Sequence, residues 1–409
     1  MTGVRAGGLL LLLAAVPVRS AAAQQPQALT LQSALERALA SNPGLTAVRL
    51  RHAVNVASRD VAAERLNPEF RAELAKETPK EGYTFAVPLE LGGKRAKRIA
   101  VGDATIAAGD AELTQAVAEI QAEVRRAYVS RVTAESRLAL LQDMQQLAQR
   151  ARDAAQARFE TGDAPRLELL QAELGLADAE NQARAARGTV DASRVTLNAL
   201  LGLAVDTVNT IDATIDAAPL LAVDAALARA RAFNAELALL DRRLAEQRAR
   251  VVLAQAMRQP DITPEGTITR RAEPEFTTGW RAAVAISIPI LTTHAAGVRV
   301  EEAAFAQLTS ERDAVVARIT GAVAAAVATA DAQREQYQRY RDAILPQAAE
   351  VERMAEDSYR LGQTGIAAYL QALQATRDVR LRAIDSAADL QNARADLERA
   401  IGAPLTATP

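Results

Sequence analysis

Cysteine is absent from the sequence, and only two of its 409 residues are histidine. The chain therefore has no disulfide framework, no thiolate metal site and no cysteine nucleophile, and His52 and His294 are too far apart in the sequence to suggest a ligand pair. A Ser/His/Asp set with supporting motifs and a glycine-rich phosphate loop are also missing. We expect no catalytic residue, no cofactor and no bound metal.

The chain also lacks a charge excess and has few aromatic residues. Its 48 basic and 50 acidic residues leave a net charge of −2, without the clustered basic excess of a nucleic-acid-binding protein. Aromatic residues make up 3% of the chain, far fewer than a globular core of this length contains. Alanine is abundant instead, and it has the highest helix propensity and allows close packing. The composition favours long, closely packed helices and excludes a nucleic-acid partner.

The N-terminus has the features of a secretory signal. Arg5 precedes an apolar run at 7–16, and the small residues Ala21 to Ala23 precede Gln24. The run is shorter than the roughly 20 residues of a membrane-spanning helix. We therefore expect a signal peptide at 1–23. No second long apolar run is evident after it, so we expect that the mature chain does not cross a membrane as helices.

An internal repeat divides the rest of the chain into two copies, at 24–213 and 214–409. The block Arg158 to Gly162 recurs at Tyr359 to Gly362 with an offset of 200 residues, and further matches upstream have an offset of 192. Each copy is expected to contain a helix, two strands, a very long helix, a turn and a helix. In the first copy the β-hairpin is expected at 68–91, the long helix at 94–159, the tip turn at 160–165 and the last helix at 166–201. In the second copy we expect a helix at 222–258, a hairpin at 260–291, a long helix at 297–360 with a bend at Pro346, a tip turn at 361–365 and a helix at 366–401.

The fold class is therefore mainly α with a small β part. Apolar and polar residues alternate in the hairpins, as in Tyr83, Phe85, Val87 against Thr84 and Ala86, which predicts strands with one apolar face. A half-buried soluble sheet is the alternative, but the chain offers no globular element to cover that face. Each strand would have about the 9 to 11 residues of a tilted membrane strand.

Four strands cannot close a barrel, and open strand edges in lipid leave backbone groups unsatisfied. The sequence therefore predicts an oligomer. A dimer would have eight strands, and side chains fill the interior of an eight-stranded barrel. A cyclic trimer would have twelve strands and a lumen.

Several segments in this order resemble TolC-type outer membrane efflux proteins. They are the opening Leu29 to Leu35 with Ala40 to Pro43, the strand exit Pro88 to Arg95, and the two turn blocks. The Leu-Gly-Gly-Lys-Arg stretch is similar to the heavy-metal, cobalt-zinc-cadmium branch. The resemblance implies a homotrimer with a twelve-stranded barrel in the outer membrane and an α-helical barrel across the periplasm.

The implied function is a passive exit duct of a tripartite efflux pump for small solutes such as metal cations or drugs. The implied partners are a periplasmic adaptor (membrane fusion) protein, an inner-membrane RND-type pump and outer membrane lipid. A periplasmic coiled-coil adaptor or a structural rod without a membrane barrel remains the alternative. A barrel protein would resist extraction from the outer-membrane fraction by salt and carbonate, whereas a rod would be released with the soluble contents of the periplasm.

Two groups of residues are candidates for function. Prolines stand at the four expected passages between helix and strand, and cations follow the first hairpin; these cations could bind lipid phosphates or simply be solvated at a helix start. The candidate junction residues are Pro68, Pro88, Pro260, Pro289, Lys94 and Arg95. At the turns, the resemblance implies a closed entrance and adaptor docking at Phe159, Gly162, Asp163, Tyr359, Leu361 and Gly362, with Glu168 as gate candidate.

The prolines are predicted to mark the periplasmic side of the membrane, with loops 77–82 and 271–277 outside the cell. A Lys80→Cys variant should therefore react with an impermeant maleimide on intact cells. Asp163→Cys is the matched control and should stay unlabelled. The reverse pattern would invert the topology.

Overall fold

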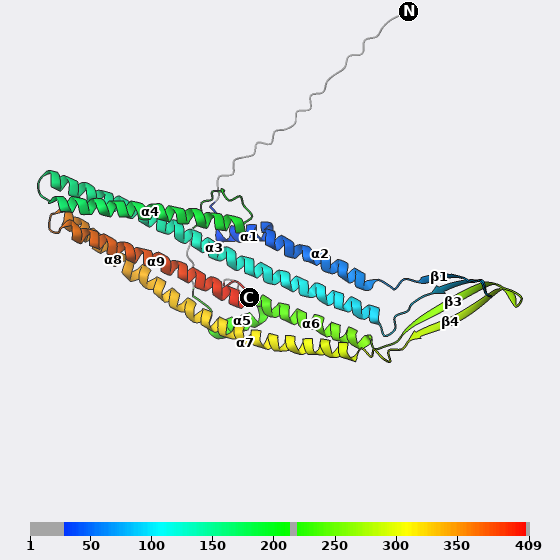
Figure 1. Cartoon of the computed structure of the whole chain (residues 1–409). Coiled ribbons are helices and arrows are strands. Elements are labelled where there is room, and N and C mark those ends of the chain that lie inside the picture. Colours follow the sequence, from blue (N-terminus) through cyan, green and yellow to red (C-terminus); the bar gives the residue numbers. More distant parts are fainter. Residues whose placement is uncertain (1–27, 213–218, 406–409) are drawn as a thin grey trace, which may run out of the picture.

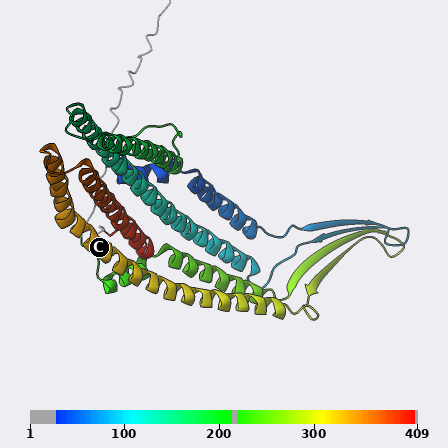
Figure 2. The ribbon, with the colours of Figure 1, turned by 60° about the vertical axis from the view of Figure 1, so that its left-hand side comes forward.

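The computed structural model describes residues 28–212 and 219–405, so the expected signal peptide at 1–23 lies outside the described residues. The chain is elongated, with helices running along most of its length and a four-stranded sheet at one end (Figure 1). Helix–helix turns lie at the opposite end, and a second view shows the curvature of the sheet (Figure 2).

The two halves of the chain have the same order of elements. The first contains α1 (Leu31–Ser41), α2 (Pro43–Ala63), β1 (Glu69–Leu74), β2 (Glu81–Ala86), α3 (Lys94–Glu160) and α4 (Arg166–Leu200). The second contains α5 (Val223–Phe233), α6 (Ala235–Ala256), β3 (Asp261–Ala272), β4 (Phe276–Ser287), α7 (Ala295–Arg339), the π-helix η1 (Tyr340–Ile344), α8 (Leu345–Arg360) and α9 (Ile366–Ile401). The helix expected at 222–258 is thus divided into α5 and α6.

Helix α3 has 67 residues and is about 100 Å long at a rise of 1.5 Å per residue. It packs against α2, α4 and α6 along its length. Buried apolar side chains form separate clusters along the bundle: one near the turns includes Leu140 and Tyr359, and others include Val323 and Val124. The core is therefore distributed along a rod.

An asparagine performs the same two tasks in each half. Asn42 Oδ1 accepts the backbone N–H of Leu45 at 3.2 Å, which caps α2, and Asn42 Nδ2 donates to the Leu200 carbonyl at 3.1 Å. In the second half, Asn234 Oδ1 accepts the N–H of Leu237 at 3.1 Å and Asn234 Nδ2 donates to the Ala400 carbonyl at 3.0 Å. Each asparagine thus begins one helix and ties it to the end of the last helix in its half.

The bend expected at Pro346 takes the form of a π-helix. Proline has no N–H to donate, and in an α-helix its ring clashes with the carbonyl four residues earlier. Here that earlier residue is Asp342, inside η1. The wider π turn accommodates the proline, and α8 continues with Pro346 in its first turn.

One apolar stretch was not foreseen from the sequence. The helix Ala295–Arg360 contains an 18-residue window that is long and apolar enough, by composition, to cross a membrane, and 22% of this window is buried within the chain. The expectation that no such stretch follows residue 23 was wrong, because alanine and valine here replace the leucines of a typical apolar run. Its buried face packs on α9 through Val323 and Val327.

The strands form one antiparallel sheet in the order β1-β2-β3-β4, so β1 and β4 are its edges. β1 and β2 have 6 residues each and β3 and β4 have 12, whereas about 9 to 11 were expected for every strand. Backbone hydrogen bonds to β3 continue beyond the end of β2: the N–H of Val87 donates to the Pro264 carbonyl at 3.0 Å, and the N–H of Leu89 donates to the Ile262 carbonyl at 2.8 Å.

The register gives the sheet two different faces. Phe70 lies opposite Phe85, and Ile268 lies opposite both Tyr83 and Trp280. Most of these side chains are exposed, including Trp280 at 83%. The apolar face consists of Phe70, Ala72, Leu74, Tyr83, Phe85, Ile262, Pro264, Ile268, Trp280, Ala282, Val284 and Ile286. The alternating positions form the opposite, polar face, with the charged residues Glu69, Arg71, Glu73, Asp261, Glu265 and Arg281, whereas Glu81 and Arg270 lie on the apolar side near the loops.

Asn234→Ala should lower the free energy of unfolding by about 1–3 kcal/mol, because it removes a cap and leaves the Ala400 carbonyl without its donor. Asn181→Ala, on the exposed face of α4, is the matched control and should change the free energy by less than about 0.5 kcal/mol. Denaturant unfolding in detergent, followed by circular dichroism, measures both. Equal stabilities would contradict the role given to Asn234.

Candidate functional site

The two turns at the far end of the bundle have the same backbone structure. Gly162 and Gly362 have φ values of 81° and 72°, as expected for glycines that end long helices. The N–H of Asp163 donates to the Arg158 carbonyl at 2.8 Å, and the N–H of Gln363 donates to the Ser358 carbonyl at 2.9 Å. These bonds satisfy carbonyls that the helix ends leave free. We call the residues 158–168 and 358–369 the tips.

A cluster of side chains joins the two tips. The Arg158 guanidinium lies over the Tyr359 ring, 5.3 Å from its centroid, and Arg158 Nη1 is 3.7 Å from Glu168 Oε2. Tyr359 stacks on Tyr369 with centroids 5.4 Å apart. Burial raises the pKa of Tyr369 to about 12, and it also raises the pKa of Tyr359, although Arg158 acts in the opposite direction. Both phenols are therefore neutral at physiological pH.

The polar atoms of this cluster are poorly satisfied. Arg158 Nη1, Glu168 Oε2 and the Tyr359 hydroxyl are buried and have no hydrogen-bond partner among the described residues. A buried polar group without a partner costs about 1–3 kcal/mol. The tips are thus held together by ring stacking, by the Arg158 guanidinium over the Tyr359 ring and by a long ion pair from Arg158 to Glu168.

The tip residues expected to dock a partner differ in exposure. Leu361 is 72% exposed and Phe159 41%, and Gly162, Asp163 and Gly362 are also exposed. Tyr359 is only 1% exposed. The Tyr359 ring is packed between Arg158 and Tyr369, so in this conformation it does not reach the surface, and its part in docking stays a prediction.

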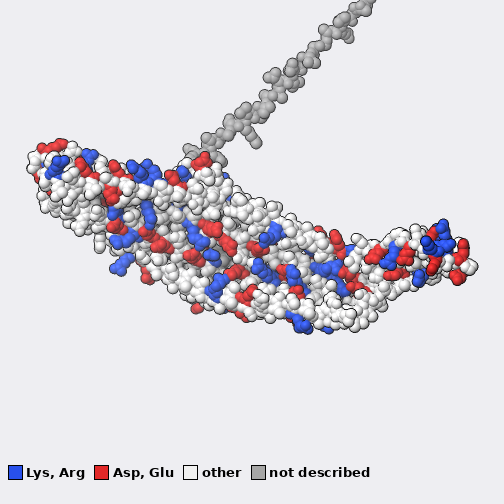
Figure 3. All heavy atoms as spheres, in the orientation of Figure 1, with Lys and Arg blue, Asp and Glu red and all other residues white. Residues whose placement is uncertain are grey.

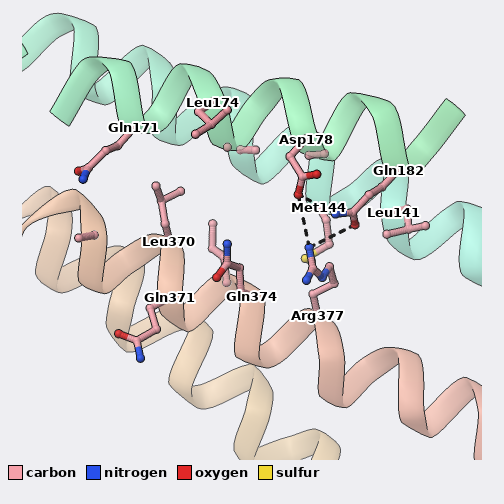
Figure 4. Close-up of a pocket in the computed structure, with 15 residues that line it drawn as sticks. Leu141, Met144, Gln171, Leu174, Asp178, Gln182, Leu370, Gln371, Gln374 and Arg377 are labelled. Atoms are coloured by element: carbon pink, nitrogen blue, oxygen red, sulfur yellow. Dashed lines mark hydrogen bonds and ion pairs between the residues drawn. The ribbon is translucent and has the colours of Figure 1, made fainter. Parts of the chain in front are cut away.

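An open groove of 560 Å³ lies between α4 and α9, next to the tips, with α3 behind it (Figure 4). Leu174 and Leu370 face each other across its apolar part. At its other end Arg377 reaches from α9 to α4, donating to Gln182 Oε1 at 3.2 Å and lying 4.0 Å from Asp178. On α4 the exposed leucines follow a helical spacing beside the groove: Leu167, Leu170 and Leu174.

The candidate prolines gather at the other end of the bundle. Pro68 and Pro260 directly precede β1 and β3, and Pro88 and Pro289 follow β2 and β4. All of them thus lie at the junction between helices and sheet (Figure 1). Their role as markers of the membrane boundary stays a prediction.

Lys94 connects the two halves at this junction. Its ammonium group is 2.7 Å from Asp261 Oδ2 and donates to the Gln259 carbonyl at 2.9 Å, and its side chain is only 5% exposed. The N–H of Leu91 donates to Asp261 Oδ1 at 3.0 Å. In this structure the Lys94 ammonium is therefore neither solvated nor turned toward lipid, because its charge is used between the exit of the first hairpin and the start of the second.

Arg95 also has a partner within the chain. Its Nε donates to the Ala63 carbonyl at 2.6 Å, and Arg98 Nε donates to the Ala62 carbonyl at 3.3 Å. These carbonyls end α2, where the helix dipole favours a cation. Arg95 and Arg98 thus bind the C-terminus of α2.

Sequence reasoning missed Asp261 and Arg158, the partners of Lys94 and Glu168. Asp261 was recognisable only as an acid directly after Pro260, and its partner is 167 residues away.

Among residues 28–212 and 219–405, no group of three or more His, Cys, Asp or Glu is placed to hold a metal. Charges of both signs are interspersed on the face shown in Figure 3.

Comparison with known proteins agrees with this architecture. The family model described as "Outer membrane efflux protein" matches residues 34–203 and 223–403, which lie in the two halves. The chain is 32% identical over 207 residues to the nickel-cobalt-cadmium resistance protein NccC of Alcaligenes xylosoxydans xylosoxydans, covering 48% of this chain and 46% of that protein. It is 30% identical over 210 residues to the cobalt-zinc-cadmium resistance protein CzcC of Cupriavidus metallidurans, covering 50% and 49%. These matches thus span about half of each relative.

The solved structures extend the comparison to nearly the whole chain. The outer membrane protein VceC from Vibrio cholerae superposes with a TM-score of 0.75 at 16% identity, covering 92% of this chain and 96% of VceC. The likeness confirms the expected fold class, in which long helices carry a small sheet. The chain therefore belongs to the outer membrane efflux protein family, whose members are channels located in the outer membrane and extending into the periplasm.

Proposed function

We propose that this chain forms, as a homotrimer, the passive exit duct of a tripartite efflux pump that carries small solutes from the periplasm to the exterior. The observation that carries the proposal is the two-faced sheet with free edges at the end of a helical rod. An apolar face of this kind suits lipid, and the opposite polar face suits a water-filled lumen.

The free edges support the trimer. β1 and β4 each have a neighbour on one side only among the described residues. In lipid, unpaired N–H and C=O groups cost several kcal/mol each, so each β4 must pair with the β1 of another chain. Cyclic closure of three chains gives twelve strands and leaves a lumen, whereas eight strands would enclose side chains only.

The apolar stretch of α7 offers a matching contact in the helical part. Its outward positions are small residues at helical spacing, which allow another helix to approach closely. They are Ala314, Ala317, Gly321, Ala325 and Ala328, all exposed in the single chain. We assign this face to the neighbouring chain of the trimer.

We assign the tips and the adjoining groove to the partners, a periplasmic adaptor protein and, through it, an inner-membrane RND-type pump. Leu361 and Phe159 present apolar side chains at the tips, and the leucines of α4 line the approach to the groove. An apolar stripe beside a groove suits an amphipathic helix. The relatives named for nickel, cobalt, zinc and cadmium resistance favour metal cations as the cargo.

Glu168 remains the gate candidate, and we propose that it acts through Arg158. Its Oε2 is buried beside Arg158, so it does not stand free as an acid facing the lumen. Docking that supplies hydrogen bonds to this cluster, or displaces it, would release the two tips from each other.

A Gly362→Val substitution tests the proposed duct. Valine is strained at a φ of 72°, so the turn must change its shape and we expect efflux-dependent metal resistance to be lost. The trimer should remain in the outer membrane after carbonate extraction, because the turn is far from the sheet. Gly188→Val is the control, since this helical glycine of α4 faces open space. Full resistance in the Gly362 variant would refute the tip assignment, and carbonate release of the wild-type protein would refute the duct.

Glu168→Gln and Arg158→Gln test the link between the tips. Each should raise the open probability of single channels in planar bilayers, because Arg158 contacts Tyr359 of the other tip and Glu168 holds Arg158 in place. The double variant should show no further increase, since the two residues act as a pair. If Glu168→Gln instead lowers cation selectivity while Arg158→Gln has no effect on opening, Glu168 is an independent acid in the lumen.

A further inference from the structure

The register places two arginines in one row across the polar face of the sheet. Arg71 in β1 lies opposite Thr84, Thr84 lies opposite Thr267, and Thr267 lies opposite Arg281 in β4. The two threonine hydroxyls are 3.0 Å apart and hydrogen-bond to each other. This arginine row thus has a cation on each edge strand and hydroxyl groups between them.

Rows carrying acids lie on both sides of the arginine row. Towards the helices, Glu69 lies opposite Ala86, which lies opposite Glu265. Towards the loops, Glu73 lies opposite Gly82, and the Glu73 carboxylate lies over this glycine. Along one strand, residues two apart are separated by about 6.7 Å. The acids and arginines are therefore within a Debye length of each other, about 10 Å at 0.1 M salt.

The charges of these three rows have no partner among residues 28–212 and 219–405. Within the described residues, no ion pair or hydrogen bond involves their side chains: Glu69, Arg71, Glu73, Glu265 and Arg281. By contrast, Asp261 at the base of the same face is neutralised by Lys94. Unpaired charges on a strand whose other face is apolar require water, and in a membrane barrel that water fills the lumen.

We propose that Arg71 and Arg281 set the charge selectivity of the duct by offsetting the carboxylates of its membrane barrel; this rests on the proposed trimeric duct. Three-fold symmetry turns each residue into a ring of three. Each chain contributes three carboxylates and two guanidinium groups to these rows, so a trimer carries nine and six.

The balance between carboxylates and guanidinium groups affects how strongly the barrel binds multivalent cations. Conduction requires that an ion bind weakly enough to leave again. Nine carboxylates alone would attract divalent cations and hold them at the exit of the duct. The arginines lower this attraction, so that a cation delivered from the periplasm is released to the exterior.

The test is the paired substitution Arg71→Gln with Arg281→Gln in trimers reconstituted into planar bilayers. Reversal potentials across a KCl gradient at about 0.1 M should show a rise of roughly threefold in the ratio of K⁺ to Cl⁻ permeability, and the rise should fade at 1 M, where the Debye length is about 3 Å. Micromolar Zn²⁺ should block the K⁺ current of the variant but not that of the wild type.

Two control variants separate the lumen charge from general effects on the sheet. Arg71→Lys with Arg281→Lys retains both charges and should behave as the wild type. Arg270→Gln removes the same charge from β3, but Arg270 alternates onto the apolar face with Ile268, so selectivity should not change. The proposal is overturned, and the duct left intact, if wild-type trimers conduct and the paired Gln variant shows unchanged selectivity and no Zn²⁺ block. A wild-type protein that forms no conducting oligomer would overturn the duct and the proposal together.

Discussion

The unpaired backbone groups along β1 and β4 constrain the rest of the chain, because a sheet with open edges is not stable in lipid. In the proposed trimer, pairing between chains closes the edges and gives the polar face a lumen to line. The same closure brings several long helices around one axis, which suits their alanine-rich, closely packing surfaces. The need to pair the backbone N–H and C=O groups of two edge strands thus determines the proposed assembly of the whole molecule.

Side-chain contacts connect distant segments at three levels of the rod, and one of them occurs in both halves. Asn42 and Asn234 tie corresponding helix ends together near its middle. At the membrane end, Lys94 and Asp261 join the two hairpins, so that the sheet is fixed to the helices as one unit. At the tips the connection through Arg158 is less well satisfied. Side chains thus satisfy each other more fully at the junction with the sheet than at the tips, where we propose that a partner acts.

Much of the fold follows from local patterns in the sequence. Alternation around Tyr83 and Phe85 indicated the strands and their apolar face, and Gly162 and Gly362 indicated the turns. The buried place of Tyr359 and the pairing of Lys94 with Asp261 could not be predicted, because they depend on how one repeat packs against the other. The two copies have nearly the same pattern, so Phe159 and Tyr359 look equivalent until packing buries only Tyr359.

Closure between chains is the central claim, and the number of chains in the membrane-extracted protein tests it most directly. Native mass spectrometry from mild detergent should give a single assembly of three copies, which supplies the twelve strands of a barrel with a lumen. A single chain or a dimer as the only species would contradict the account, because the free edges would then be covered in some other way.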